Sequence, residues 1–124
     1  MNDLEFVQVK AVALAVSDAE RAKRFYRETL GLPPDTIQNI DGAVMIGNVI
    51  LLLKSEEEWY GKPSEELNPR ITIEVKDSYA TEKALIERGV TISDPVTVYD
   101  KNPIGAFLDS EGNKLWFCSD SGKS

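Results

Sequence analysis

The sequence contains no histidine and a single cysteine, Cys118. Without histidine, the chain lacks the most common general base near neutral pH and the most common ligand for transition metals. Catalysis by a serine or cysteine nucleophile that histidine activates is therefore excluded. One cysteine cannot form a disulfide within the chain, so the sequence gives no reason to expect an oxidising compartment.

The sequence also lacks an excess of basic residues and a long apolar run. Acidic residues outnumber Lys and Arg by 21 to 14, the formal charge is −7, and no basic cluster interrupts the sequence. We therefore expect no binding to nucleic acid. No apolar run reaches the roughly 18–20 residues of a membrane span, and residues 1–5 have no signal-peptide pattern. We expect a soluble cytoplasmic protein without membrane contact.

The first half of the chain predicts a β-α-β-β-β unit. Its 124 residues, of which 42% are apolar, suffice for one domain with one core. Apolar residues dominate 6–16, which predicts a strand, and Ser17 with Glu20 forms a capping box for a helix that ends at Gly31. Asp41-Gly42 predicts a hairpin between two strands, and Gly47-Asn48 predicts a turn into a strand over 49–54.

The second half repeats this order. A strand that ends near Asp77 precedes a helix that Gly89 ends, and strands are expected at 96–99, 105–108 and 114–118. The turn Gly112-Asn113 matches Gly47-Asn48 at an offset of 112 − 47 = 65, which aligns Leu51 with Trp116. We predict a single domain of two repeats, about 6–54 and 69–119, joined by a polar connector over 55–68.

Two stretches carry a family resemblance: VALAVSDAERAKRFYRETLGL in the first half and FLDSEGNKLWF near the end. They resemble the vicinal oxygen chelate superfamily of glyoxalases, bleomycin-resistance proteins and extradiol dioxygenases, over about residues 10–119. The resemblance implies an α+β fold in which tandem βαβββ units form a curved mixed sheet with a concave cleft. It also implies a homodimer, with the cleft formed within one chain or across two. It identifies no activity, because one scaffold serves many reactions and also plain binding.

Metal-using members of this superfamily carry four His or Glu ligands on the first and last strands of the two units. The resemblance places these positions at Ala11, Leu51, Arg70 and Trp116. Alanine and leucine have no donor atom, the indole N–H only donates hydrogen bonds, and a guanidinium does not deprotonate. We therefore expect no metal and no other cofactor.

Alternation along the strands divides the residues between two faces of the sheet. Val12, Leu14 and Val16 are expected to lie beneath the helices. Seven residues are expected to line the cleft and bind a ligand: Ala11, Ala13, Leu51, Leu53, Arg70, Thr72 and Trp116. In the connector, Trp59 and Tyr60 form either a lid over this cleft or an anchor on the sheet edge.

Each polar or aromatic candidate in the cleft has two interpretations. Arg70 either pairs with a carboxylate such as Glu74 or binds an anionic group of a ligand. Trp116 either fills the space of the absent metal or provides a surface for a planar ligand. Glu74 is a weak candidate for a general base, and Cys118 is expected to be a packing residue.

Three functions are compatible with these features. The first is a metal-independent binding protein of the bleomycin-resistance type, which holds an aromatic or amphipathic ligand in the cleft. The second is a lyase, isomerase or dioxygenase-like enzyme that acts without the usual metal site or through unrecognised ligands. The third is a scaffold whose cleft is filled by its own side chains. The absence of histidine and of the four ligands favours the first.

Overall fold

The computed structural model describes residues 4–59 and 68–120, apart from the side chains of residues 58 and 59. The first unit contains β1 (Ala11–Val16), α1 (Ala19–Arg24), the π-helical turn η1 (Phe25–Thr29), β2 (Val44–Ile46), β3 (Val49–Ser55) and α2 (Glu56–Trp59). The second contains β4 (Ile71–Glu74), α4 (Ser78–Glu87), β5 (Ile92–Tyr99), β6 (Asn102–Leu108) and β7 (Lys114–Cys118). Within these residues, no helix has the length and apolar character needed to span a membrane.

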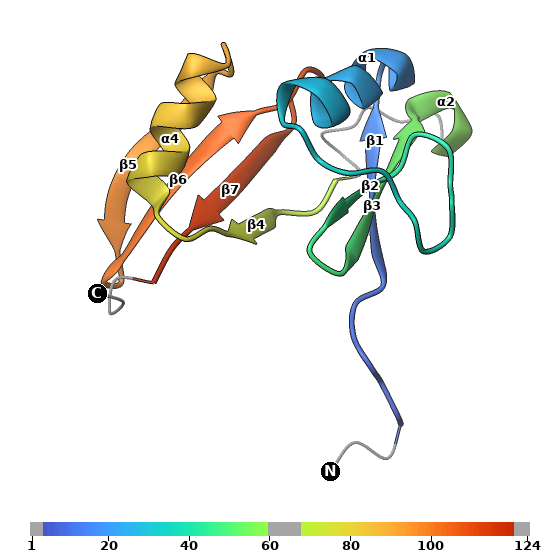
Figure 1. The fold of residues 1–124 in the computed structure, drawn as a ribbon, viewed down its shortest axis with the longest axis horizontal. Coiled ribbons are helices and arrows are strands. Elements are labelled where there is room, and N and C mark those ends of the chain that lie inside the picture. The colour runs from blue at the N-terminus through green and yellow to red at the C-terminus, as the bar shows by residue number, and fades with distance from the viewer. Residues whose placement is uncertain (1–3, 60–67, 121–124) are drawn as a thin grey trace.

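The strands form two mixed sheets, which confirms the predicted α+β class. The first sheet has the order β1-β3-β2 and the second has the order β4-β7-β6-β5. In each sheet the first and last strands of the unit pair in parallel, and the other pairs are antiparallel. Figure 1 shows α1 above the first sheet and α4 against the second, with β4 between the two units. The sheets do not close into one continuous surface.

Aspartates cap both of the longer helices. The Asp18 carboxylate accepts a hydrogen bond from the Arg21 N–H at 3.0 Å, and the Asp77 carboxylate accepts one from the Tyr79 N–H at 3.0 Å. The predicted capping role of Ser17 was therefore wrong by one residue. Its hydroxyl instead donates to a carboxylate oxygen of Glu111 in the second unit, at 2.7 Å.

The strand expected before Asp41-Gly42 does not form. Instead, the buried Asp35 carboxylate accepts three backbone hydrogen bonds, at 2.8 to 3.0 Å, from Ile37, Gln38 and Ile40. Burial alone would raise the pKa of Asp35, but these three bonds hold it below its usual range. Because they fold the segment into tight turns, the first sheet has three strands where the sequence predicted four.

One cluster of buried apolar residues joins the helices to the inner faces of the sheets. It comprises Leu14, Tyr26, Val44, Leu51, Leu85, Val90, Phe107, Leu115 and Phe117. Members come from both units, so the core is continuous across the junction. A smaller cluster of Ala43, Met45 and Ile50 lies on the other face of the first sheet, with Leu52 packed against it.

The pairing register corrects the predicted faces of β3. Val12 lies opposite Leu51, and Leu14 lies opposite Leu53. Because paired residues of neighbouring strands point to the same face, Leu51 and Leu53 lie on the core side. Leu51 is only 2% exposed. The prediction that Leu51 and Leu53 face a cleft together with Ala11 was therefore wrong.

The equivalence between the two units shifts accordingly. Ala13 pairs with Leu52 in the first sheet, and Thr72 pairs with Trp116 in the second. Since Ala13 and Thr72 are themselves equivalent, Trp116 corresponds to Leu52, at an offset of 116 − 52 = 64. The offset of 65 was one residue too long, and such a slip moves every side chain of a strand to the opposite face.

Glu111 links the second unit to the start of α1. Its carboxylate accepts bonds from the Arg21 guanidinium at 2.7 and 2.9 Å, from the Ser17 and Ser110 hydroxyls, and from the Asp18 N–H. The Glu111 side chain is fully covered, whereas that of Arg21 is half exposed. Burial opposes ionisation, but the hydrogen bonds from Arg21, Ser17, Ser110 and Asp18 lower the pKa of Glu111 from 4.5 to about 2.

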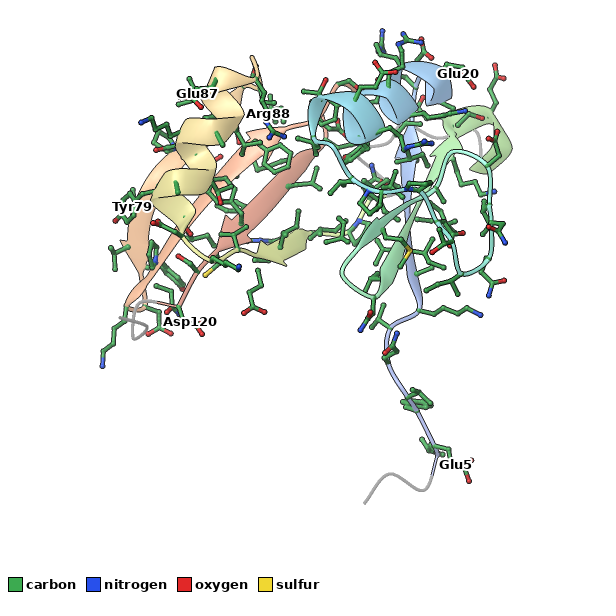
Figure 2. The ribbon with its side chains drawn as sticks, in the orientation of Figure 1. Glu5, Glu20, Tyr79, Glu87, Arg88 and Asp120 are labelled. Carbon is green, nitrogen blue, oxygen red and sulfur yellow. The ribbon has the colours of Figure 1, made fainter. Side chains whose placement is uncertain are left out.

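Further hydrogen bonds cross the junction. The Asn68 side chain accepts from the Ala15 N–H at 2.7 Å and donates to the Ala15 carbonyl at 3.0 Å, as a neighbouring strand would. The buried Tyr26 hydroxyl donates to Asp109 at 2.6 Å. Figure 2 shows Arg88 at the end of α4 nearest the first unit, where its guanidinium donates to the Leu30 carbonyl at 3.2 Å. These contacts fix the two units relative to each other.

The register predicts different costs for truncating neighbouring leucines of β3. Leu51→Ala removes a side chain from the main core, so the free energy of unfolding should fall by about 2–5 kcal/mol. Leu52→Ala, on the opposite and partly exposed face, should cost less. Urea denaturation of both variants measures the difference. A larger loss for Leu52→Ala would contradict the register.

The Glu111 junction predicts a pH-dependent stability. Because the pKa of Glu111 is lowered from 4.5 to about 2 in the folded state, its ionisation stabilises the fold fully above pH 4.5, and this contribution disappears as pH falls through 2. Replacing Glu111 by Gln should lower the free energy of unfolding at neutral pH by up to about 3 kcal/mol, with screening at the half-exposed Arg21 reducing the loss.

The measurement is denaturant unfolding of the parent and of Glu111→Gln across this pH range. The difference between them should shrink towards the acidic end. Glu87→Gln, which alters an exposed acid on α4 (Figure 2), is the matched control and should track the parent throughout. A difference that stays constant with pH would mean that Glu111 stabilises the junction by packing rather than by charge.

Candidate functional site

A pocket lies on the face of the second sheet that points away from α4. Its volume is about 670 Å³, and it is lined by Arg70, Ser93, Asp94, Pro95, Thr97, Tyr99, Ile104 and Trp116. Core residues of β4, β6 and β7 occupy the opposite face, against α4. The pocket therefore belongs to the second unit alone.

The strand register brings these side chains together in two rows across the sheet. In the first row, Thr72 pairs with Trp116, Trp116 with Ala106, and Ala106 with Asp94. Because paired residues share a face, these four side chains point the same way. The second row lies two residues along β4, β6 and β7 and three along β5, and comprises Glu74, Cys118, Ile104 and Thr97. Of the charged and aromatic residues of the pocket, Asp94 and Trp116 lie in the first row, and Arg70 and Tyr99 lie outside both rows.

Two cationic side chains lie against the Trp116 ring. The Arg70 guanidinium carbon lies 4.3 Å from the centre of the Trp116 ring, and the Lys114 ammonium lies 5.2 Å from it. Both distances fall in the range of cation–π attraction. The Lys114 ammonium is also 2.8 Å from a carboxylate oxygen of Asp94. A hydrogen bond from Lys114 is the main reason that the pKa of Asp94 is lowered from its usual value.

Within the described residues, Arg70 is the cation of this group that forms no ion pair, although its charge also contributes to the lowered pKa of Asp94. Among residues 4–59 and 68–120, the ion pairs join Arg21 to Glu111, Lys23 to Asp41, and Lys114 to Asp94. The alternative that Arg70 pairs with Glu74 is therefore not supported. Its guanidinium instead lies over an indole, which leaves its N–H groups available to an oxyanion.

The structure brings together only part of the predicted site. Arg70 and Trp116 are in contact, and Thr72 lies beside Trp116 in the sheet. Ala11 and Ala13 lie on the first sheet, opposite Ile50 and Leu52, and do not line this pocket. Leu51 and Leu53 lie on the core side of β3, where Leu51 and Thr72 line a separate pocket of about 470 Å³. The Trp59 side chain and Tyr60 lie outside the described residues.

Sequence reasoning missed Asp94, Thr97, Tyr99 and Ile104. Tyr99 is 74% exposed at the end of β5, two residues from Thr97, so both point to the pocket side of the strand. The available signal was this two-residue alternation before the tight turn at Asp100-Lys101, where both residues have positive φ. The expected strand of 96–99 contained Thr97 and Tyr99 but was not assigned a face.

The two weaker candidates lie at the margin of the pocket. Glu74 is exposed, so it lacks the enclosed environment in which a lone carboxylate becomes an effective base. Cys118 is half-buried in the same row, and its nearest polar contact is a weak one, 3.7 Å from the Ser119 carbonyl. Neither residue completes a pair of groups for acid–base or nucleophilic chemistry.

The residues present do not fit the metal site of the superfamily. With the corrected register, the four positions that the resemblance implies hold Ala11, Leu52, Arg70 and Trp116, none of which offers a lone pair to a divalent cation. Elsewhere in the described part of the chain, no three His, Cys, Asp or Glu side chains gather as a metal site would require. Arg70 and Trp116 occupy two of the positions that the resemblance assigns to metal ligands in metal-using members.

Solved structures with this fold serve different functions. TnmS3, an antibiotic binding protein from a Streptomyces species, is 23% identical, with a TM-score of 0.73 over 94% of this chain and 98% of that one. A lactoylglutathione lyase from Agrobacterium tumefaciens is 15% identical, with a TM-score of 0.73 over 94% of this chain and 96% of that one. No curated protein matches the sequence.

The sequence itself identifies the family. A member of the glyoxalase/bleomycin resistance protein/dioxygenase superfamily from Sphaerobacter thermophilus is 24% identical, with a TM-score of 0.72 over 93% of this chain and 98% of that one. These structural similarities establish the fold. The sequence pattern of the superfamily matches residues 8–117, which is most of the chain. The protein therefore belongs to the glyoxalase/bleomycin resistance protein/dioxygenase superfamily.

Proposed function

We propose that the protein binds a small planar aromatic compound with an anionic group, without the aid of a metal, in the pocket of the second sheet. The observation that carries this proposal is the position of Arg70, stacked 4.3 Å from the centre of Trp116 and without a carboxylate partner among the described residues. A guanidinium held in this way binds carboxylate, sulfonate or phenolate oxygens through two N–H groups.

The rest of the pocket suits the aromatic part of such a ligand. Tyr99 and Trp116 provide aromatic surface, and Pro95 and Ile104 provide apolar surface. The Thr97 hydroxyl offers one hydrogen bond to a polar substituent. A volume of about 670 Å³ falls within the range of small-molecule sites.

The charge balance of the pocket supports an anion rather than a cation. The Lys114 charge is neutralised by Asp94 at 2.8 Å, so one positive charge remains, on Arg70. The indole of Trp116 presents one face to that charge, so a ligand contacts the guanidinium and the rim of the indole together.

Binding is favoured over catalysis by the residues available. TnmS3 is an antibiotic binding protein, which supports a binding function on this fold, whereas the lyase shows that the fold also serves chemistry. In this chain, the acid of the second row is Glu74. It is exposed, and none of the residues that line the pocket is placed to exchange a proton with it. We therefore propose a binding protein.

We also propose that the protein is a homodimer. The edge strands β1 and β4 each have one side that no other strand of the described chain covers. Open edges of this kind favour pairing with another chain. A second copy is the partner most consistent with the resemblance to dimeric members of the superfamily.

A matched pair of fluorescent probes tests the role of Arg70. 8-Anilinonaphthalene-1-sulfonate and N-phenyl-1-naphthylamine share one aromatic system, and only the first carries a sulfonate. The parent should bind the sulfonate more tightly, and Arg70→Ala should weaken that binding by about 1–3 kcal/mol while leaving the neutral probe almost unaffected. Fluorescence titration measures both affinities.

Two control variants separate charge from packing. Arg27→Ala removes an exposed arginine from η1 and should change neither affinity. Trp116→Ala should weaken both probes, because it removes aromatic surface that they share. Equal affinity of Arg70→Ala and the parent for the sulfonate would refute the proposed anion contact. A large loss of stability in Trp116→Ala with unchanged affinity would make the indole a structural residue.

The residues at the four positions of the metal site also predict that purified protein contains no stoichiometric Zn, Fe, Mn or Ni. Alanine, leucine, arginine and tryptophan at the four positions cannot hold such an ion. Elemental analysis by mass spectrometry should find far less than one equivalent, and a chelator should leave the melting temperature unchanged. One equivalent of metal whose removal lowers that temperature would show that other ligands form a site.

A further inference from the structure

A second pocket adjoins the pocket of the second sheet, at the junction of the two units. This junction pocket has a volume of about 370 Å³, and Leu14 of the first unit lines it together with Lys114 of the second. Arg70 and Trp116 line both pockets. The stacked guanidinium and indole therefore form a wall that the two pockets share.

The two pockets differ in the charges of their linings. The described residues that line the junction pocket include two cations, Arg70 and Lys114, and no acid. Those that line the pocket of the second sheet include Arg70 and Asp94, one of each sign, together with the aromatic and apolar side chains of Tyr99 and Ile104. An anion is therefore attracted more strongly to the junction pocket, and an aromatic ring is better accommodated in the other.

The two cations of the junction pocket are neighbours across the parallel strands β4 and β7. Arg70 immediately precedes β4, and Lys114 is the first residue of β7. Because Ile71 lies opposite Leu115, the same register places Arg70 beside Lys114. Their charged groups lie against one ring, 4.3 and 5.2 Å from its centre. Like charges side by side on two strands repel each other, so an anion bound between them would remove a repulsion.

Lys114 keeps hydrogen-bonding capacity beyond its ion pair. An ammonium carries three N–H donors, and the Asp94 carboxylate at 2.8 Å takes one of them. The side chains of the pair are 43% and 37% exposed, so a ligand can reach them. Arg70 forms no ion pair within the described residues. N–H groups of both cations therefore remain for one anion.

The amide side chains of the junction pocket are already hydrogen-bonded to the protein. Asn68 bonds to the N–H and the carbonyl of Ala15, at 2.7 and 3.0 Å, and donates to the Asn113 side chain at 2.8 Å. The Asn113 amide in turn donates to Asp109 at 3.2 Å. These amides hold the pocket in shape, and the two cations are the groups left to contact an anion.

We propose that the anionic group of the ligand enters the junction pocket and is held between Arg70 and Lys114, while its aromatic part stays in the pocket of the second sheet. This inference rests on the proposed function, and it assigns Lys114 a part in selecting the ligand. A carboxylate, sulfonate or phosphate has two or three oxygens and reaches both cations. A phenolate has one oxygen, so the ligand carries one of the larger groups.

The two fluorescent probes used for Arg70 also test Lys114. Lys114→Met keeps the aliphatic part of the side chain and removes the charge. It should weaken the binding of 8-anilinonaphthalene-1-sulfonate by about tenfold and leave that of N-phenyl-1-naphthylamine almost unchanged. Lys83→Met removes an exposed lysine of α4, which lies against the opposite face of the sheet, and should change neither affinity.

Removal of the competing carboxylate should have the opposite effect. Asp94→Asn frees the Lys114 ammonium for the ligand, so the sulfonate should bind about threefold more tightly or better. In a chain that also carries Lys114→Met, the same substitution should have a much smaller effect. A double-mutant cycle over the four proteins measures this coupling. An equal gain in both backgrounds would mean that Asp94 acts on Arg70 alone, and would overturn the inference.

The outcomes distinguish this inference from the proposed function. If Arg70→Ala weakens sulfonate binding and Lys114→Met does not, the anion contacts Arg70 alone, so the inference fails and the proposed function stands. If neither substitution changes that affinity, both fail. Equal weakening of the two probes by Lys114→Met would show that the lysine contributes packing rather than charge. An Asp94→Asn variant that binds the sulfonate no more tightly than the parent would refute the inference without any change at Lys114.

Discussion

The fully covered carboxylate of Glu111 is the interaction on which the arrangement of the two units depends. It lies in the turn before β7, yet its hydrogen bonds run to Arg21, Ser17 and Asp18 at the start of α1. A buried anion requires several donors, and the short turn and the helix start supply them only when the units adopt one orientation. That orientation turns β4, the edge strand of the second sheet, towards the first unit, with Arg70 immediately before it.

Much of this fold could be predicted from local sequence patterns, because the ends of helices and strands depend on residues that are neighbours in the sequence. Alternation and the preceding turn gave β7 its correct bounds of 114–118, and Gly89 marked the end of the second helix. The register of β3 could not be predicted in this way. Gly47-Asn48 is a two-residue link from β2 to β3, whereas Gly112-Asn113 ends a longer turn, in which the Asp109 carboxylate accepts from the Glu111 and Asn113 N–H groups. The Gly-Asn dipeptide therefore precedes β3 and β7 in registers that differ by one residue.

The candidate site shows a similar division. Arg70 and Trp116 were identified from their place on the strands, and their contact follows from the parallel pairing of β4 and β7. On the opposite wall, Asp94 was missed because the pairing of β5 with β6 has a register shift on either side of it, which no local pattern reveals. Thr97 and Tyr99 alternate along the expected strand of 96–99, but that strand was not assigned a face. Where metal-using relatives need a cation and its ligands, this chain has a side-chain cation on an aromatic ring. In the proposed function, this guanidinium contacts the anionic group of the ligand.

The central claim is that a ligand contacts Arg70 and Trp116 together. Heteronuclear NMR of labelled protein, titrated with 8-anilinonaphthalene-1-sulfonate, observes both groups through the Arg70 Nε–H and the Trp116 indole N–H. A Trp59→Phe variant assigns the indole signal. The account predicts that both signals shift together and saturate at one equivalent, with the Arg21 Nε–H signal unchanged at the buried junction. Saturable binding that shifts other residues while Arg70 and Trp116 stay in place would contradict it.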